Sequence, residues 1–122
     1  MDFDAARPIW LQLVEEFRRR IAVGLWRPGG KIPSVRDLAL ELGVNPNTVQ
    51  RALAELDRLG LTASERTAGR YVLGDQEAVD STASEIATQL TDTYIAQIRG
   101  LGYGLDDVVE RLRTRWDTTK GD

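Results

Sequence analysis

The chain of 122 residues contains neither cysteine nor histidine, and these two absences exclude several kinds of chemistry. Without cysteine there is no disulfide framework and no thiolate nucleophile. Without either residue type, the usual protein ligands of transition metals are missing. The Asp and Glu residues are scattered over predicted helix surfaces and show no catalytic spacing with a nucleophile or base. We therefore expect a protein that is not an enzyme and needs no metal or cofactor.

Long apolar runs are also lacking. No segment approaches the roughly twenty apolar residues that a membrane-spanning helix requires. The N-terminus has no basic region followed by an apolar signal segment. The sequence therefore predicts a cytoplasmic protein with no membrane partner.

Positive charge is scarce overall, since the net charge is −3, but its distribution is uneven. Residues 1–74 carry 11 Lys and Arg against 9 Asp and Glu, whereas residues 75–122 carry 5 against 10. The N-terminal part is thus slightly basic and the C-terminal part is acidic. A local basic surface is enough to meet phosphates, because the contact surface sets that affinity rather than the total charge.

The central pattern of the chain is residues 34–60, SVRDLALELGVNPNTVQRALAELDRLG. Ser34 followed by Asp37 predicts a capped helix start, and Gly43 suits a left-handed helix end. Asn45 and Pro46 then predict the start of a second helix. The buried stripe predicted for this helix consists of Val49, Leu53, Leu56 and Leu59. Two short helices joined by a tight glycine turn predict a helix-turn-helix.

Polar residues at the start of the second helix indicate that it reads DNA. Asn47, Thr48, Gln50 and Arg51 lie off the apolar stripe, where a recognition helix meets base edges and phosphates. Arg36 holds the corresponding place in the first helix. An arginine fork can bind guanine O6 and N7 together. Any one of these residues would also suit an ordinary solvated helix face.

This segment resembles a known family. PSVRDLALELGVNPNTVQRALAELDRLGL, with LWRPGGKI before it and a predicted hairpin after it, is similar to the winged helix-turn-helix of bacterial GntR-type transcription regulators. The resemblance covers roughly residues 8–73, and the short helical tail is similar to the YtrA subgroup. It implies a mostly α fold with a small β-hairpin. Residues 1–74 would form the DNA-binding head and residues 75–122 a two-helix dimerisation segment.

The same resemblance implies a homodimeric repressor that binds a double-stranded DNA operator. The twofold symmetry of such a dimer predicts an operator with an inverted repeat. The alternative is a winged-helix module used for protein contacts without specific DNA binding. A small-molecule effector is conceivable, but the sequence does not identify one, because two helices leave little volume for a drug-sized pocket.

The segments before the central pattern are expected to support it. Residues 2–7 are expected to form a loose arm, and a helix is predicted from Pro8 to Gly24. Pro28-Gly29-Gly30 predicts a turn within a connector, residues 25–33. Lys31, just before the capped helix, fits a phosphate contact and simple solvation about equally well.

Two short extended runs after Gly60 predict a hairpin, the wing, with its turn at residues 64–70. In the resembling family the wing tip is commonly richer in glycine, whereas Thr67 and Ala68 occupy it here. Gly69 is flanked by Arg66 and Arg70, and arginine can read a narrow minor groove. The predicted DNA-binding residues are Lys31, Ser34, Arg36, Asn45, Asn47, Thr48, Gln50, Arg51, Arg66, Gly69 and Arg70.

The C-terminal segment shows two apolar helical seams that its own length cannot cover. Monomers rarely leave such contiguous apolar surface exposed, so a second copy is expected to cover it. A tail that folds back on the head of its own chain is the alternative. The predicted dimer-interface residues are Val79, Ala83, Ile86, Leu90, Tyr94, Ile98, Leu101, Leu105, Val109, Leu112 and Trp116.

Overall fold

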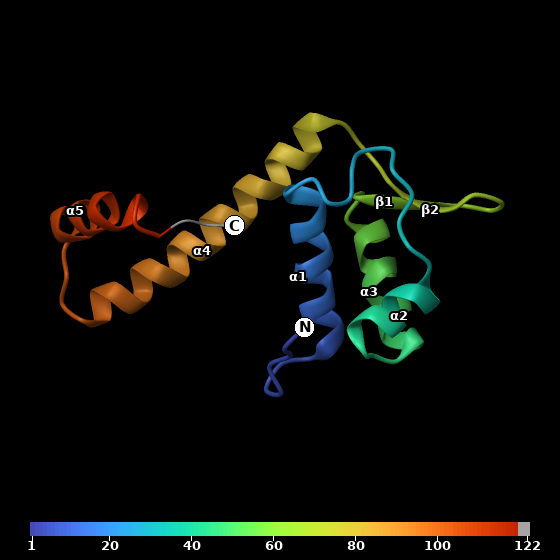
Figure 1. Ribbon diagram of the computed structural model, residues 1–122, viewed down its shortest axis with the longest axis horizontal. Coiled ribbons are helices and arrows are strands. Elements are labelled where there is room, and N and C mark those ends of the chain that lie inside the picture. The colour runs from blue at the N-terminus through green and yellow to red at the C-terminus, as the bar shows by residue number, and fades with distance from the viewer. Residues whose placement is uncertain (120–122) are drawn as a thin grey trace. The chain divides into compact units, whose positions relative to one another are not determined.

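Five helices and one antiparallel hairpin make up residues 1–119, the part of the chain that this computed structural model describes (Figure 1). The elements are α1 (Ile9–Ala22), α2 (Val35–Leu42), α3 (Pro46–Arg58), β1 (Thr62–Glu65), β2 (Gly69–Val72), α4 (Gln76–Gly100) and α5 (Leu105–Trp116). The prediction of a mostly α fold with a small hairpin is confirmed.

The chain divides into two compact units, Met1–Ile86 and Ala87–Asp122, and the division falls within the sequence of α4. The predicted boundary between residues 74 and 75 stays a prediction. The start of α4 is part of the first unit, where Val79 and Thr82 are buried. The last three residues of the predicted C-terminal segment, 120–122, lie outside the described residues.

The core of the first unit is built around α3, which packs against both α1 and α2. Apolar residues recur every three or four positions, so each helix turns one face inward. Leu59 differs from its predicted burial and is 44% exposed, because α3 ends at Arg58. Ala52 is buried in the stripe instead. The largest fully buried apolar side chains are Phe17, Leu13, Ile21, Leu38, Leu53, Leu56, Val49 and Val72.

Local caps fix the turn between α2 and α3. The Ser34 hydroxyl accepts a hydrogen bond from the Asp37 backbone N–H at 3.0 Å. Gly43 ends α2 with φ of +68°, in the left-handed region that favours glycine. The Asn45 side chain accepts from the Asn47 N–H at 2.8 Å and starts α3. The predicted helix-turn-helix is therefore confirmed down to its caps.

The wing has a neighbour that the sequence did not predict. β1 pairs with β2 from Thr62↔Val72 to Glu65↔Gly69, so the turn is shorter than predicted and contains only residues 66–68. Along β2, the Ile32 N–H donates to the Arg70 carbonyl at 2.9 Å. The Val72 N–H donates to the Gly30 carbonyl, also at 2.9 Å. Part of the predicted connector thus lies against β2, and it fixes the wing to the start of α2.

Residues 2–7 are not the loose arm that the sequence predicted. Gln12, which is buried on α1, accepts a hydrogen bond from the Asp4 N–H at 2.8 Å. Its amide nitrogen donates to the carbonyls of Asp4 at 2.7 Å and Arg7 at 3.0 Å. A buried amide whose partners are all backbone groups holds the arm on the helix.

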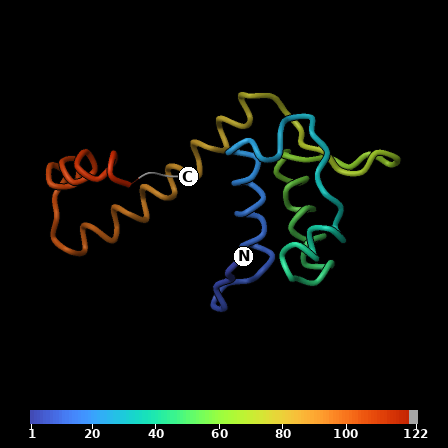
Figure 2. The backbone as a smooth tube through the Cα atoms, in the orientation of Figure 1, coloured from blue at the N-terminus to red at the C-terminus, as the bar shows by residue number. Residues whose placement is uncertain are grey.

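The second unit consists of the last turns of α4 and the whole of α5, and the chain reverses between them (Figure 2). Gly102 has φ of +90° in this turn. Asp107 accepts from the Gly104 N–H at 3.3 Å, and Arg111 lies over the Tyr103 ring at 4.8 Å. No residue of α5 is buried. The second unit therefore presents apolar side chains that its own residues leave uncovered.

Candidate nucleic-acid interface

The N-terminal end of α3 presents a row of polar side chains at the surface. Asn47, Gln50 and Arg51 are exposed, and Thr48 is half-buried. Asn45 is exposed as well, and its side-chain N–H₂ remains a donor because only its oxygen serves as the cap. A helix N-terminus that carries amide and hydroxyl donors suits phosphate oxygens.

A surface groove of about 380 Å³ brings together predicted residues from separate elements. The predicted DNA-binding residues that line it are Lys31, Ser34, Gln50, Gly69 and Arg70. They come from the segment before α2, from α3 and from β2, and the groove also contains Ser64 and Glu65. The fold therefore joins the predicted reading helix and the wing along one groove.

Gly69 is the position where the wing approaches Lys31. Its φ is +81°, and a Cβ atom there would meet Lys31 Cε at 3.2 Å. Any other residue would be strained by this backbone conformation and would also push the lysine stem aside. Because Gly69 has no side chain, Lys31 can lie close beside the start of β2.

Arg70 points toward α3. Its Nε and Nη2 donate to the two carboxylate oxygens of Asp57 at 3.2 and 3.0 Å. The Thr62 hydroxyl donates to the same carboxylate. The Arg70 side chain is only 13% exposed, so its first role here is to fasten the wing to the end of α3. Its DNA contact stays a prediction, and Asp57 is a supporting residue that helical spacing did not reveal.

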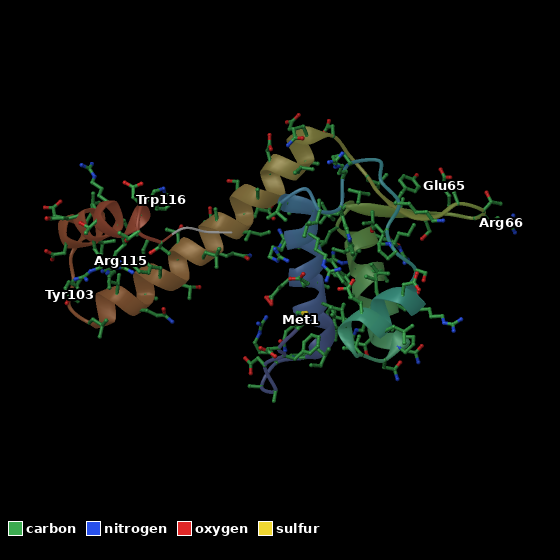
Figure 3. All side chains as sticks on the ribbon, in the orientation of Figure 1. Met1, Glu65, Arg66, Tyr103, Arg115 and Trp116 are labelled. Carbon is green, nitrogen blue, oxygen red and sulfur yellow. The ribbon has the colours of Figure 1, made fainter. Side chains whose placement is uncertain are left out.

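Arg66 stands at the wing tip beside Glu65, and both project from the hairpin (Figure 3). Both side chains are exposed. Within residues 1–119, Arg66 makes no ion pair. A cation carried on an extended tip can reach a phosphate or a minor groove.

Arg51 lies against an aromatic residue of α1, Trp10. Its guanidinium carbon lies 4.1 Å from the centroid of the Trp10 ring, which is half-buried on α1. This is a close cation–π contact. Arg36, in comparison, is exposed and has no ion-pair partner in the described part of the chain. The two predicted reading arginines therefore differ in how firmly they are placed.

The basic cluster near the end of α1 is neutralised by acids. The hydrogen bond from Arg19 holds the pKa of Glu16 below its ordinary value, and a hydrogen bond to Glu41 raises the pKa of Arg20. These arginines are therefore paired with acids of the first unit rather than open to phosphate. The ion pairs are Arg18–Glu85, Arg19–Glu16, Arg20–Glu16 and Arg20–Glu41.

Across residues 1–119, no group of acidic side chains is arranged to hold a metal ion. Helices long and apolar enough to cross a membrane are likewise not found among these residues.

The head has three helices around one core, a glycine turn before an exposed recognition helix, and a hairpin beside it. These features define the winged helix-turn-helix class. The family model described as "Bacterial regulatory proteins, gntR family" matches residues 10–72, and the chain therefore belongs to this family of transcription regulators.

Relatives agree with this assignment. The chain is 31% identical over 112 residues to YhcF of Bacillus subtilis strain 168, named an uncharacterized HTH-type transcriptional regulator, covering 92% of this chain and 93% of that protein. It is 38% identical over 72 residues to the HTH-type transcriptional repressor YtrA of the same organism, covering 59% of this chain and 55% of YtrA. The chain is thus similar to YtrA-like members of the family.

Solved structures extend the comparison to three dimensions. A GntR family transcriptional regulator from Listeria monocytogenes superposes with a TM-score of 0.84 at 34% identity, covering 92% of this chain and 98% of that one. The DNA-binding domain of AraR, solved in complex with operator ORX1, gives a TM-score of 0.52 at 32% identity. That match covers 54% of this chain and 80% of the AraR domain.

Proposed function

We propose that this protein is a homodimeric repressor that binds an inverted-repeat DNA operator. The observation that carries the proposal is the groove in which Lys31, Ser34 and Gln50 meet the wing beside the exposed start of α3. Two relatives support it, because the similar AraR domain was solved on an operator and the similar YtrA is named a repressor.

The residues divide by the part of DNA that each can reach. Arg36, Gln50 and Arg51 carry side chains that can make paired hydrogen bonds to base edges in the major groove. Arg66 on the wing is suited to the minor groove. The remaining side chains position the head on the phosphate backbone, and they are Lys31, Ser34, Asn45, Asn47 and Thr48.

The dimer is proposed from the apolar side chains of the second unit. Leu90 is 67% exposed, Leu101 is 73% exposed and Leu105 is 75% exposed. Trp116, at the end of α5, is 77% exposed (Figure 3). A second copy covers such a surface by twofold symmetry, and the same symmetry presents two heads to inverted half-sites. Val79 is left out of this interface, because it is buried in the core of the first unit.

The test is selection of bound sequences from a random duplex pool with the full chain. We expect an enriched site with two inverted half-sites, bound at least about a thousandfold more tightly than scrambled duplex. Equal binding to both duplexes would contradict the proposal and favour the protein-contact module instead.

Repression is tested separately by transcription in vitro from a promoter that overlaps the selected site. Added protein should lower the yield of transcript, because the bound dimer excludes the polymerase. An increased yield would contradict the repressor assignment without affecting the DNA-binding proposal.

A further inference from the structure

A second groove, of about 330 Å³, lies within the first unit and has no part in the proposed DNA contacts. Its lining comes from α1, from the turn between α3 and β1, and from the start of α4. The lining residues that matter for its chemistry are Arg18, Leu59, Leu61, Ala78, Ser81 and Glu85.

Arg18 is the charged group of this groove, and its hydrogen bonds are incomplete. Its side chain is 15% exposed, and Nη2 donates to a carboxylate oxygen of Glu85. Its Nε is buried and has no hydrogen-bond partner among the described residues. Leaving a buried donor of a charged group unpaired is costly. The Nε–H and an Nη–H of a guanidinium point the same way, and together they match the two oxygens of one carboxylate.

Glu85 is a weak occupant of that fork. Its carboxylate accepts a hydrogen bond from Nη2 of Arg18 but none from Nε, and the Glu85 side chain is 62% exposed. An exposed carboxylate loses little when it turns back to water, because solvent screens such pairs. A carboxylate that engaged both donors would satisfy the buried Nε as well.

The rest of the groove suits a small organic chain. Leu59 is 44% exposed at the end of α3, and Leu61 and Ala78 add further apolar surface. Ser81 is exposed and supplies a hydroxyl, whereas the Thr82 hydroxyl already donates to the Ala78 carbonyl at 3.0 Å. An apolar wall with few polar groups is typical of small-molecule sites.

We propose that this groove binds a small organic carboxylate. The ligand's two oxygens accept from Nε and Nη2 of Arg18 and displace Glu85, and its apolar chain lies against Leu59 and Leu61. The charge on Arg18 remains neutralised throughout, because one carboxylate replaces another.

Binding also has a consequence for the protein. Arg18 lies on α1 and Glu85 on α4, so the ligand removes an ion pair between these helices in the first unit. This consequence, unlike the site itself, rests on the proposed function, because its readout is operator affinity. The Glu85→Gln variant without ligand should reproduce whatever change the ligand causes in operator binding by the wild type.

The site is tested by isothermal titration calorimetry of the full chain with hexanoate, with hexanamide as the uncharged match. We expect hexanoate to bind in the millimolar range and hexanamide not to bind. Glu85→Gln should tighten hexanoate binding about tenfold, because it removes the competing carboxylate from the fork. Arg18→Lys should weaken it at least about tenfold, because an ammonium cannot present the paired donors.

The control is Glu77→Gln, which removes the same charge from an exposed position on the same helix. It should leave the affinity for hexanoate unchanged. The proposal is overturned if hexanoate binds neither wild type nor Glu85→Gln, if hexanamide binds equally well, or if Glu77→Gln tightens binding as much as Glu85→Gln. Glu85 is exposed, so its variant remains foldable even if Arg18→Lys is not. No DNA is present in the titration, so its failure is distinct from failure of the operator proposal.

Discussion

Arg36 and Arg51 carry the same charge, but the structure surrounds them differently. Arg36 is exposed on α2, whereas the Arg51 guanidinium lies 4.1 Å from the Trp10 ring centroid. A side chain already held in place loses less conformational entropy when it binds. Trp10 therefore positions Arg51, and it links α1 to the proposed reading face of α3.

Truncating Arg36 to alanine should weaken binding to the selected operator by about 1–3 kcal/mol and reduce discrimination at one base pair. The reason is the loss of the proposed bidentate contact with guanine. Titrations of selected and scrambled duplex measure both effects. Arg58→Ala is the matched control, because Arg58 is 69% exposed at the opposite end of the reading helix and pairs with Glu55. An equal loss on both duplexes would make Arg36 a phosphate contact instead.

The contact between Trp10 and Arg51 should appear as a coupling energy in the folded protein. We expect a double-mutant cycle of Trp10→Leu and Arg51→Ala to give about 0.5–1 kcal/mol, typical of a partly exposed cation–π pair. Denaturant unfolding of the four proteins measures it. Additive effects of the two substitutions would show that the aromatic ring does not hold Arg51.

Glu16 should make the head sensitive to acid. Hydrogen bonding from Arg19, followed by Arg20, holds the pKa of Glu16 below its ordinary value of 4.5. The folded protein therefore binds fewer protons than the unfolded chain at acidic pH, and this contribution to stability is present above pH 4.5. It is lost as the pH falls through the folded value. Glu16→Gln should flatten the decrease of the unfolding free energy at acidic pH, which denaturant unfolding at a series of acidic pH values measures. An equally steep decrease in this variant would contradict the prediction.

At the scale of elements, the wing is held on two sides. Arg70 joins it to Asp57 at the end of α3, and the Ile32 N–H joins β2 to the segment before α2. The helices and the wing are thus fixed to one another by an ion pair and by backbone hydrogen bonds. The tip, residues 66–68, lies beyond the paired strands and is the part of the wing proposed to contact DNA.

Two substitutions separate the support of the wing from its contact with DNA. Arg66→Ala should lower the slope of log affinity against log salt by about 0.9, the value for one phosphate contact. Asp57→Asn should keep that slope but lower the unfolding free energy by about 1–3 kcal/mol, because it weakens the partner of a largely buried arginine. Salt titrations and denaturant unfolding measure the two quantities. An unchanged slope in Arg66→Ala would place the tip away from DNA.

At the scale of the whole molecule, the second unit has no core of its own around α5, because no residue of this helix is buried in the single chain. Joining two heads raises the effective concentration of the second head once the first has bound. The proposed dimer would thus bind one operator through both heads, and its affinity would exceed that of either head alone.

Charged substitutions in the second unit should separate the copies. Leu101→Asp and Leu105→Asp each place a carboxylate where an apolar side chain is 73% and 75% exposed in the single chain. If a second copy covers these positions, each change should weaken the dimer at least about tenfold, because a charge would be buried. Sedimentation at micromolar concentration measures this. Leu40→Asp, 74% exposed on α2, is the matched control and should remain dimeric. A wild-type chain that sediments as a monomer would refute the dimer.

The amino-acid sequence determined the features that depend on neighbouring residues. Ser34, Gly43 and Asn45 cap helices through hydrogen bonds and backbone angles that span only a few positions. Apolar spacing likewise predicted the buried faces of α1, α2 and α3, apart from Leu59, whose exposure follows from where α3 ends. These interactions join residues only a few positions apart, so the order of residue types in the sequence is enough to predict them.

The tertiary structure decided the features whose partners are distant in the chain. Arg70 bonds Asp57 across 13 positions, and Arg18 bonds Glu85 across 67. An exposed arginine and a paired arginine look alike in a sequence, because charge, spacing and helix propensity are the same for both. What distinguishes them is the element that packing brings alongside, and packing depends on the whole core rather than on any one segment.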